Sequence, residues 1–139
     1  MTYFLDTNVA MYAAGGAHRL QAPCQRIIQA AGQGHISIVL STEVLQELLH
    51  RYVALGERQR ACALVEHVAD LATAILPIAH QDIIKAMELL RRYTALTTRD
   101  AIHLATMLNH QMTELLSADQ VFDAISEIHR TDPLTFRTP

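Results

Sequence analysis

Residues 2–8 read TYFLDTN, and this stretch decides the fold. Its apolar run, Tyr3 to Leu5, has the length of a short buried strand and ends directly at the acid Asp6. Similar runs recur along the chain and predict strands at Ile36–Leu40, Ala74–Ile78 and Leu115–Leu116, with a weak fifth strand near Ile128. Short strands separated by longer segments are typical of α/β proteins.

The segments between these runs repeat their apolar residues with the period of a helix. The predicted helices are Ala22–Ala31, Thr42–Leu55, Arg58–Leu71, Gln81–Tyr93 and Asp100–Gln111. This alternation predicts a three-layer α/β/α sandwich around a central, mainly parallel sheet of four or five strands. Pro77 cannot donate a hydrogen bond to a neighbouring strand, so the third strand is expected at an edge of the sheet.

Composition limits the class of protein. A chain of 139 residues, half of them apolar, is expected to form a single domain over residues 1–139. Its formal charge of −3 argues against binding nucleic acid through bulk positive charge. Cys24 and Cys62 belong to no metal-binding or disulfide pattern, and both are interpreted as core thiols. No leader and no apolar run of membrane-spanning length is found, so we expect a cytoplasmic protein without membrane contact.

Several acids are predicted to lie where strands end or helices begin. Asp6 ends the first strand, Asp119 follows the fourth, and Asp100 begins the last predicted helix. Glu43 and Glu47 follow the second strand four residues apart, so they share one helix face, which we expect to be opposite the core. Ligands of open α/β sheets bind beyond the carboxyl ends of the strands, so these acids are expected to converge.

Converging carboxylates are suited to hard divalent cations such as Mg²⁺, which prefer oxygen ligands. Bound metal can activate a water and stabilise the leaving oxygen of a phosphodiester. Asp6, Glu47, Asp100 and Asp119 are the candidate catalytic residues and metal ligands, and Asp123, four residues after Asp119, is a further candidate ligand. Mn²⁺ is expected to substitute for Mg²⁺.

Each acid also has a structural explanation. Asp6 or Thr7 could cap the helix that follows, and Glu43 could complement a helix dipole. The segments Thr97–Asp100 and Ser117–Gln120 both fit capping boxes. The sequence alone leaves these alternatives open.

Other polar residues have two readings as well. Glu47 could be a solvated surface acid paired with Arg51, four residues on. His103, one turn after Asp100, either reaches the acidic cleft or is a partly buried, hydrogen-bonded imidazole. A basic group near the last helix fits phosphate binding and a solvated helix end equally well; its members are Arg91, Arg92 and Arg99.

Four segments in order resemble the motifs of one nuclease family. They are FLDTN at 4–8, STEVLQE at 41–47, DAIHLA at 100–105 and LSADQVF at 116–122. Together they are similar to the PIN-domain nucleases, specifically the VapC-like toxins of type II toxin–antitoxin systems, and the similarity runs across nearly the whole chain.

The resemblance implies a PIN-like α/β/α sandwich, Mg²⁺ or Mn²⁺ at the acidic cleft, and endonucleolytic cleavage of RNA. It also implies a cognate antitoxin protein that inserts a segment into the cleft, and a homodimer. Asp119 matches the fourth motif, which leaves Asp123 as an outer or second-metal ligand. Residues expected to position ligands or the scissile phosphate are Thr7, Asn8, Ser117 and Arg99.

Three other functions are alternatives to a nuclease. Phosphoryl transfer of the haloacid-dehalogenase type needs a second acid two residues after Asp6, where this chain has Asn8. A receiver-type phospho-acceptor needs a lysine late in the chain, and the only lysine is Lys85. A PIN-like module that binds RNA or protein without cleaving it stays open, because geometry decides catalysis.

Overall fold

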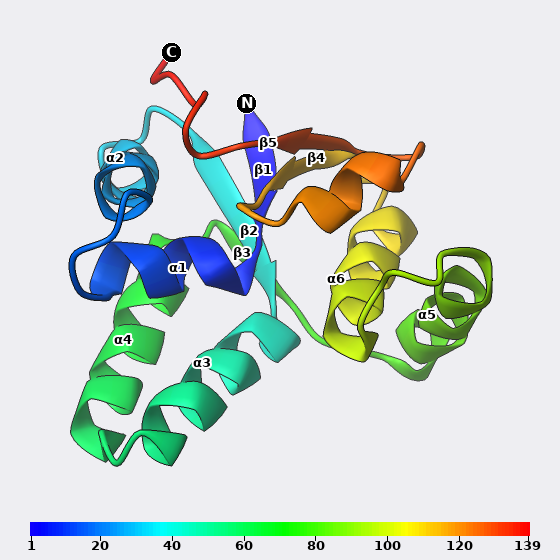
Figure 1. Ribbon diagram of the computed structural model, residues 1–139, viewed down its shortest axis with the longest axis horizontal. Coiled ribbons are helices and arrows are strands. Elements are labelled where there is room, and N and C mark those ends of the chain that lie inside the picture. The colour runs from blue at the N-terminus through cyan, green and yellow to red at the C-terminus, as the bar shows by residue number, and fades with distance from the viewer.

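Five strands form one all-parallel sheet at the centre of the computed structural model, which describes residues 1–139 (Figure 1). The strands are β1 (Thr2–Leu5), β2 (Ser37–Ser41), β3 (Ala74–Leu76), β4 (Glu114–Leu116) and β5 (His129–Thr131), in the spatial order β3-β2-β1-β4-β5. Every neighbouring pair is parallel. The predicted α/β sheet is therefore confirmed, including its weak fifth strand.

The central position of β1 follows from its composition. Phe4 and Leu5 are fully buried, and β1 pairs with β2 on one side and with β4 on the other. A strand covered on both faces needs such a continuous apolar run. By contrast, β3 lies at the edge and is largely exposed, as Pro77 predicted, and it ends at Leu76, directly before the proline.

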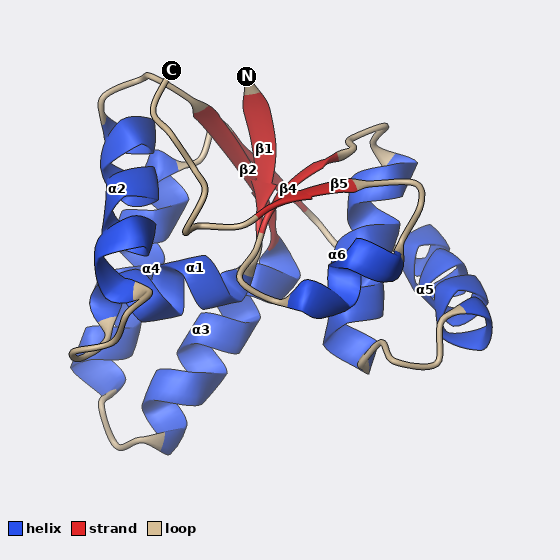
Figure 2. Ribbon diagram, turned by 45° about the horizontal axis from the view of Figure 1, so that its top comes forward, coloured by secondary structure: helices blue, strands red, loops and turns tan.

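Helices cover both sides of the sheet (Figures 1 and 2). One group consists of α1 (Thr7–Ala14), α2 (Gln21–Gly32), α3 (Thr42–Ala54) and α4 (Arg58–Leu71). The other consists of α5 (His80–Arg92) and α6 (Thr98–Asn109), which pack on each other. A 3-10 helix, η1 (Gln120–Ala124), follows β4. The three-layer arrangement is confirmed, and the buried apolar side chains form one continuous core.

Two helical elements lie outside the predicted helix ranges; α2 and α5 each begin one residue before their predicted starts, and α6 begins two residues before. The unpredicted elements are α1, which spans only eight residues and stops before Gly15, and η1. Helix α6 begins at Thr98 rather than Asp100 because a capping box fixes its start. The Thr97 hydroxyl accepts from the Asp100 amide and the Asp100 carboxylate accepts from the Thr97 amide, both at 3.2 Å.

The two thiols have different environments. Cys24 is fully buried, as predicted, and burial raises its pKa to about 12. The core prediction is wrong for Cys62, which is exposed on α4. That helix buries Ala61 and Val68, and the next position after Ala61 points away from the core. None of the helices has both the length and the apolar character needed to cross a membrane.

Candidate active site

Asp6 lies at the point in the sheet where the strand order reverses. It follows β1, whose neighbours β2 and β4 are reached by chain crossovers on opposite sides, and ligands of such sheets bind at this point. The residue is 5% exposed. It occupies the N-cap position of α1, yet its carboxylate accepts no capping hydrogen bond, so capping does not account for it.

Ser117 and Asn8 hold the Asp6 carboxylate by one oxygen. Asp6 Oδ2 accepts from Ser117 Oγ at 2.6 Å and from Asn8 Nδ2 at 3.1 Å. Ser117 Oγ in turn accepts from the Asp119 amide at 3.0 Å, and Asn8 Oδ1 accepts from the Ala118 amide at 3.1 Å. These bonds join the ends of β1 and β4, and they leave Asp6 Oδ1 without a hydrogen bond.

His103 lies between two of the predicted acids. Its ring is 2% exposed, and Nε2 stands 3.4 Å from Glu47 Oε1 and 3.8 Å from Asp6 Oδ1. The interpretation of a buried, hydrogen-bonded imidazole is confirmed, and the same ring also reaches the acids. It comes from α6, so α6 contributes to the site a side chain that lies beside Asp6, directly after β1, and Glu47 of α3.

The acidic face of α3 lies outside the hydrophobic core, as predicted, and it is turned toward the site. Glu43 and Glu47 are 20% and 19% exposed, and they face α6 instead of solvent. Each has an oxygen 3.8 Å from the Arg99 guanidinium, and Glu47 forms no ion pair with Arg51. The packing of α3 against α6 turns this face toward the site.

The charged side chains at the site shift one another's pKa values. Burial raises the pKa of Asp6, the charges of Asp100 and Glu47 raise it further, and His103 and the Ser117 hydrogen bond act against this rise. Burial also acts to raise the pKa of Glu47, but the hydrogen bond from His103 and the charge of Arg99 outweigh it, so that pKa is lowered. Burial opposes the charged imidazole, yet the nearby carboxylates raise the pKa of His103.

The remaining predicted catalytic acids, Asp100 and Asp119, differ in how they relate to Asp6. Asp100 is within electrostatic reach of Asp6 and also caps α6. Asp119 is exposed, its Oδ1 accepts from the Val121 amide at 3.0 Å, and it joins the cluster only through its backbone bond to Ser117. Asp6, Glu47 and Asp100 therefore form the centre of the site, with Asp119 at its edge.

The carboxylate of Asp123 pairs with Arg130, a residue that was not predicted from the sequence. Its carboxylate binds Arg130 of β5 through two hydrogen bonds of 2.7 and 3.0 Å. Arg130 is 8% exposed and also donates to the Ser117 carbonyl at 2.9 Å and to Asp132 at 3.2 Å. Arg130 thus links the residue after β4 to Asp123 of η1 and to Asp132. No sequence signal marks it, because the contacts depend on β5 pairing with β4.

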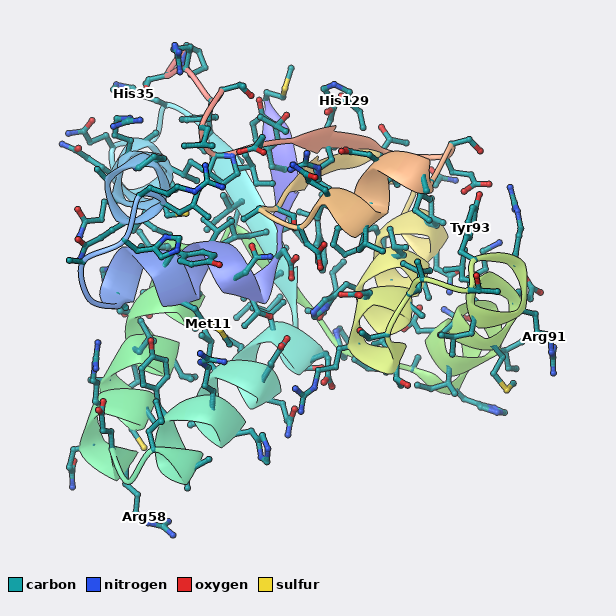
Figure 3. All side chains as sticks on the ribbon, viewed as in Figure 1. Met11, His35, Arg58, Arg91, Tyr93 and His129 are labelled. Atoms are coloured by element: carbon teal, nitrogen blue, oxygen red, sulfur yellow. The ribbon has the colours of Figure 1, made fainter.

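Of the three predicted basic residues, only Arg99 reaches the acids. Arg92 pairs with Glu127 and covers the ring of Tyr93 at 5.0 Å. Arg91 lies on the outer side of α5, away from the site (Figure 3).

The donors at the site fit a hydrated divalent cation. No three His, Cys, Asp or Glu side chains come together closely enough to hold a metal ion by themselves. The carboxylates of Asp6, Glu47 and Asp100 are nevertheless the ligand type that Mg²⁺ prefers, and Mg²⁺ keeps several of its waters. The hydroxyl of Thr7 is buried there without a hydrogen-bond partner, although it lies near enough to Glu47 to help lower that pKa.

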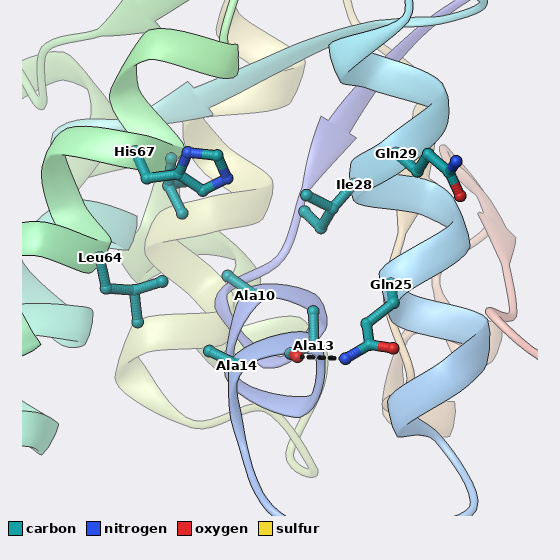
Figure 4. A pocket seen from close by; sticks show the side chains of 9 residues that line it. Ala10, Ala13, Ala14, Gln25, Ile28, Gln29, Leu64 and His67 are labelled. Atoms are coloured by element: carbon teal, nitrogen blue, oxygen red, sulfur yellow. Dashed lines mark hydrogen bonds between the residues drawn. The ribbon is translucent and has the colours of Figure 1, made fainter.

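A separate apolar cavity of about 260 Å³ lies between α1, α2 and α4 (Figure 4). Small and aliphatic side chains such as Ala10, Ile28 and Leu64 line it, and Gln25 at its rim donates to the Ala13 carbonyl at 3.1 Å. Its only titratable lining residue is His67, so this cavity supplies no acid to the site.

The sequence matches known proteins along most of its length. Residues 3–128 match the family model of the PIN domain. Ribonuclease VapC13 of Mycobacterium tuberculosis is 36% identical over 126 residues, which cover 91% of this chain and 96% of that relative. Ribonuclease VapC23 of the same organism is 34% identical over 116 residues, covering 84% and 91% of the two chains.

Solved structures share the fold. VapC20 of Mycobacterium tuberculosis, described as a sarcin–ricin loop cleaving toxin, has a TM-score of 0.73 and 17% identity, covering 91% of this chain and 95% of that one. A toxin–antitoxin complex from Klebsiella pneumoniae has a chain with a TM-score of 0.67 and 19% identity, covering 94% and 97%. At such identities the likeness establishes the fold alone.

Proposed function

Because the chain belongs to the PIN-domain family, among the VapC ribonuclease toxins, we propose that it is an endoribonuclease that cleaves RNA phosphodiesters with water at the Asp6 site. One observation carries the proposal. Asp6, at the carboxyl end of the central strand, interacts by charge with both Glu47 and Asp100, and the three residues come from distant segments of the chain. Burial raises the pKa of Asp6 and the charges of Asp100 and Glu47 raise it further, so the charged form of Asp6 is costly to keep without a cationic partner.

The proposed reaction depends on Mg²⁺. Asp6, Glu47 and Asp100 would hold it directly or through water, with Asp119 acting from the edge of the site. When bound, Mg²⁺ makes a water a stronger acid and stabilises the leaving oxygen of the phosphodiester. Asp6 Oδ1 would be the oxygen available to hold Mg²⁺, because Ser117 and Asn8 both donate to Oδ2.

The remaining residues act as positioning groups. Ser117 and Asn8 fix the direction of the Asp6 carboxylate, and His103 sets the distance between Asp6 and Glu47. Arg99 is 45% exposed beside Glu47, where its guanidinium is available to a phosphate that approaches from solvent.

Cleavage of a mixed RNA pool tests the proposal. Wild type, Asp6→Asn and the control Asp70→Asn, an exposed acid on α4, are each incubated with Mg²⁺, Mn²⁺ or EDTA. Discrete fragments are expected from wild type and Asp70→Asn with either metal, and none from Asp6→Asn or with EDTA. Metal-dependent cleavage by a folded Asp6→Asn protein would refute the assignment. A folded wild type that never cuts would favour the non-cleaving binding module.

We also propose a cognate antitoxin protein as partner, because relatives with this fold occur in toxin–antitoxin complexes. Expression of the chain alone is expected to arrest growth in a manner that Asp6→Asn abolishes. Coexpression of the protein encoded beside it should restore growth, and failure of every neighbouring product to do so would contradict the proposed partner. Homodimer formation stays a prediction, to be tested by light scattering.

A further inference from the structure

We propose that a cavity beside the acidic site is a subsite for single-stranded RNA, in which a base stacks on the Tyr12–His18 pair and Arg51 binds a neighbouring phosphate. This inference rests on the proposed cleavage of RNA. It assigns the groove along which the substrate continues once its scissile phosphate lies at Asp6.

The first argument is continuity with the acidic site. The cavity has a volume of about 540 Å³, and ligand sites commonly have volumes of about 300–1,000 Å³. Residues of α1, the loop after it, the end of α3 and the start of α4 line it. Asn8 is one of these lining residues, and the same side chain donates to Asp6 Oδ2 at 3.1 Å. A chain bound at Asp6 therefore has direct access to the cavity.

The second argument is a preformed stacking surface. The rings of Tyr12 and His18 are stacked, with centroids 4.7 Å apart and planes at 29°. His18 is exposed, and its orientation is fixed because Nδ1 accepts from the Leu20 amide at 3.1 Å. Both rings also line a second cavity, whose lining includes Ala118 and Gln120. The Tyr12–His18 pair is therefore shared by two cavities beside the site. Unpaired bases stack on such rings with little regard to sequence.

The third argument is charge. The chain carries a formal charge of −3, yet no acidic side chain lines this cavity. Two arginines do. Arg60 is already engaged, since it pairs with Glu57 at 2.8 Å and covers the Tyr52 ring at 5.0 Å. Arg51 is exposed, and its guanidinium forms no ion pair or hydrogen bond, which leaves it free for a phosphate.

Binding of RNA measured without cleavage tests the subsite. A fluorescein-labelled, random-sequence 12-nucleotide RNA is titrated with protein in EDTA at several salt concentrations. Tyr12→Ala is expected to weaken binding about 5- to 100-fold, as loss of a base–aromatic stack does, with an unchanged salt slope. Tyr12→Phe keeps the ring and should bind like wild type. Arg51→Gln should lower the slope of log K against log salt by about 0.7, the share of one phosphate on a single strand.

The control and a second substitution keep the result interpretable. Arg91→Gln removes an equally exposed arginine from α5, which Figure 3 shows far from the cavity residue Met11, and it should bind like wild type. Tyr12 is half-buried, so Tyr12→Ala could lower stability. Tyr12→Leu retains apolar volume without an aromatic face, and it should lose affinity with an unchanged melting temperature.

Failure of the subsite and failure of the proposed function give different results. The subsite would be overturned if Tyr12→Leu and Arg51→Gln bound RNA as tightly as wild type does. It would also be overturned if wild type bound single-stranded and duplex RNA with equal affinity. Either result would stand even if wild type cleaves RNA with Mg²⁺. Wild type that binds no RNA would overturn it too. Loss of affinity in these variants, in a wild type that binds RNA but never cleaves it, would support the subsite and refute the nuclease.

Discussion

Replacing Ser117 by alanine should weaken both the fold and the site. The Ser117 hydroxyl is fully buried and bridges the ends of β1 and β4. It donates to Asp6 Oδ2 at 2.6 Å, and it accepts from the Asp119 amide at 3.0 Å and from Asn8 Nδ2 at 3.3 Å. Alanine fits the same space without steric conflict, so the change removes these hydrogen bonds and little else.

The expected loss follows from the two kinds of hydrogen bond. A hydrogen bond to a charged group contributes about 1.5–3 kcal/mol, and a donor left without its acceptor in a buried place costs about 1–3 kcal/mol. Asn8 keeps its bond to Asp6, so the second cost is partial. The free energy of unfolding should fall by about 2–4 kcal/mol. For a domain of this size that is a decrease of about 10 °C in Tm.

The loss should depend on pH through Asp6. Burial raises the pKa of Asp6, and the Ser117 bond counteracts part of that rise, so the pKa should increase further in Ser117→Ala. Above the folded pKa the carboxylate is charged and the hydroxyl stabilises it most. As the pH falls through that pKa, the carboxyl becomes neutral, and the difference between wild type and variant should shrink.

Urea unfolding without metal at several pH values measures this difference. Ser126→Ala is the matched control, because the exposed Ser126 hydroxyl makes only a 3.4 Å bond to Glu127. A destabilisation no larger than that of the control would refute the reasoning. So would a difference that grows as the pH falls, since that would place the stabilisation on the protonated carboxyl.

Three further predictions concern metal, charge and backbone. Mg²⁺ at about 100 times its Kd should stabilise wild type by about 2.7 kcal/mol in thermal unfolding and leave Asp6→Asn unchanged; an equal shift in both would remove Asp6 from the site. Arg130→Gln should cost about 2 kcal/mol in urea, since the arginine is 8% exposed while its partner Asp123 is largely exposed. Arg130 lowers the pKa of Asp123, so this stabilisation is present above the unfolded pKa near 3.9 and is lost as the pH falls through the folded value; a pH-independent loss would contradict the pairing. Gly56→Ala should cost about 1 kcal/mol because Gly56 has φ +79°, whereas Gly16→Ala, with nothing within 4 Å and no positive φ, should cost less; equal losses would exclude backbone strain as the cause.

The sheet was predictable because its signals are local. The apolar run before Asp6 determines a strand buried on both faces, and Pro77 determines which strand lies at the edge. Helix α1 was missed because it has only eight residues and no side-chain cap, which is too little for a periodic pattern. Contacts with α2 and α3 support it instead, and these appear only in the folded chain.

The sequence predicted which acids approach Asp6 but not the contacts that they make. The strand-end rule correctly grouped Asp6 with Glu47 and Asp100. The direction of Glu47 depends on how α3 packs against α6, which an isolated helical pattern cannot give. The pairing of Asp123 with Arg130 likewise depends on β5 pairing with β4. Long-range packing therefore decided what the local pattern left open.

The order of the strands also bears on synthesis of the protein. Asp6 is synthesised before the hydroxyl that orients it, which lies 111 positions later in the chain. The nascent chain carries Asp6 and Glu47 long before β4 is available to pair with β1, and Asp100 precedes β4 by only 14 residues. An unfinished copy is therefore expected to lack the oriented Asp6 carboxylate on which the proposed cleavage of RNA depends.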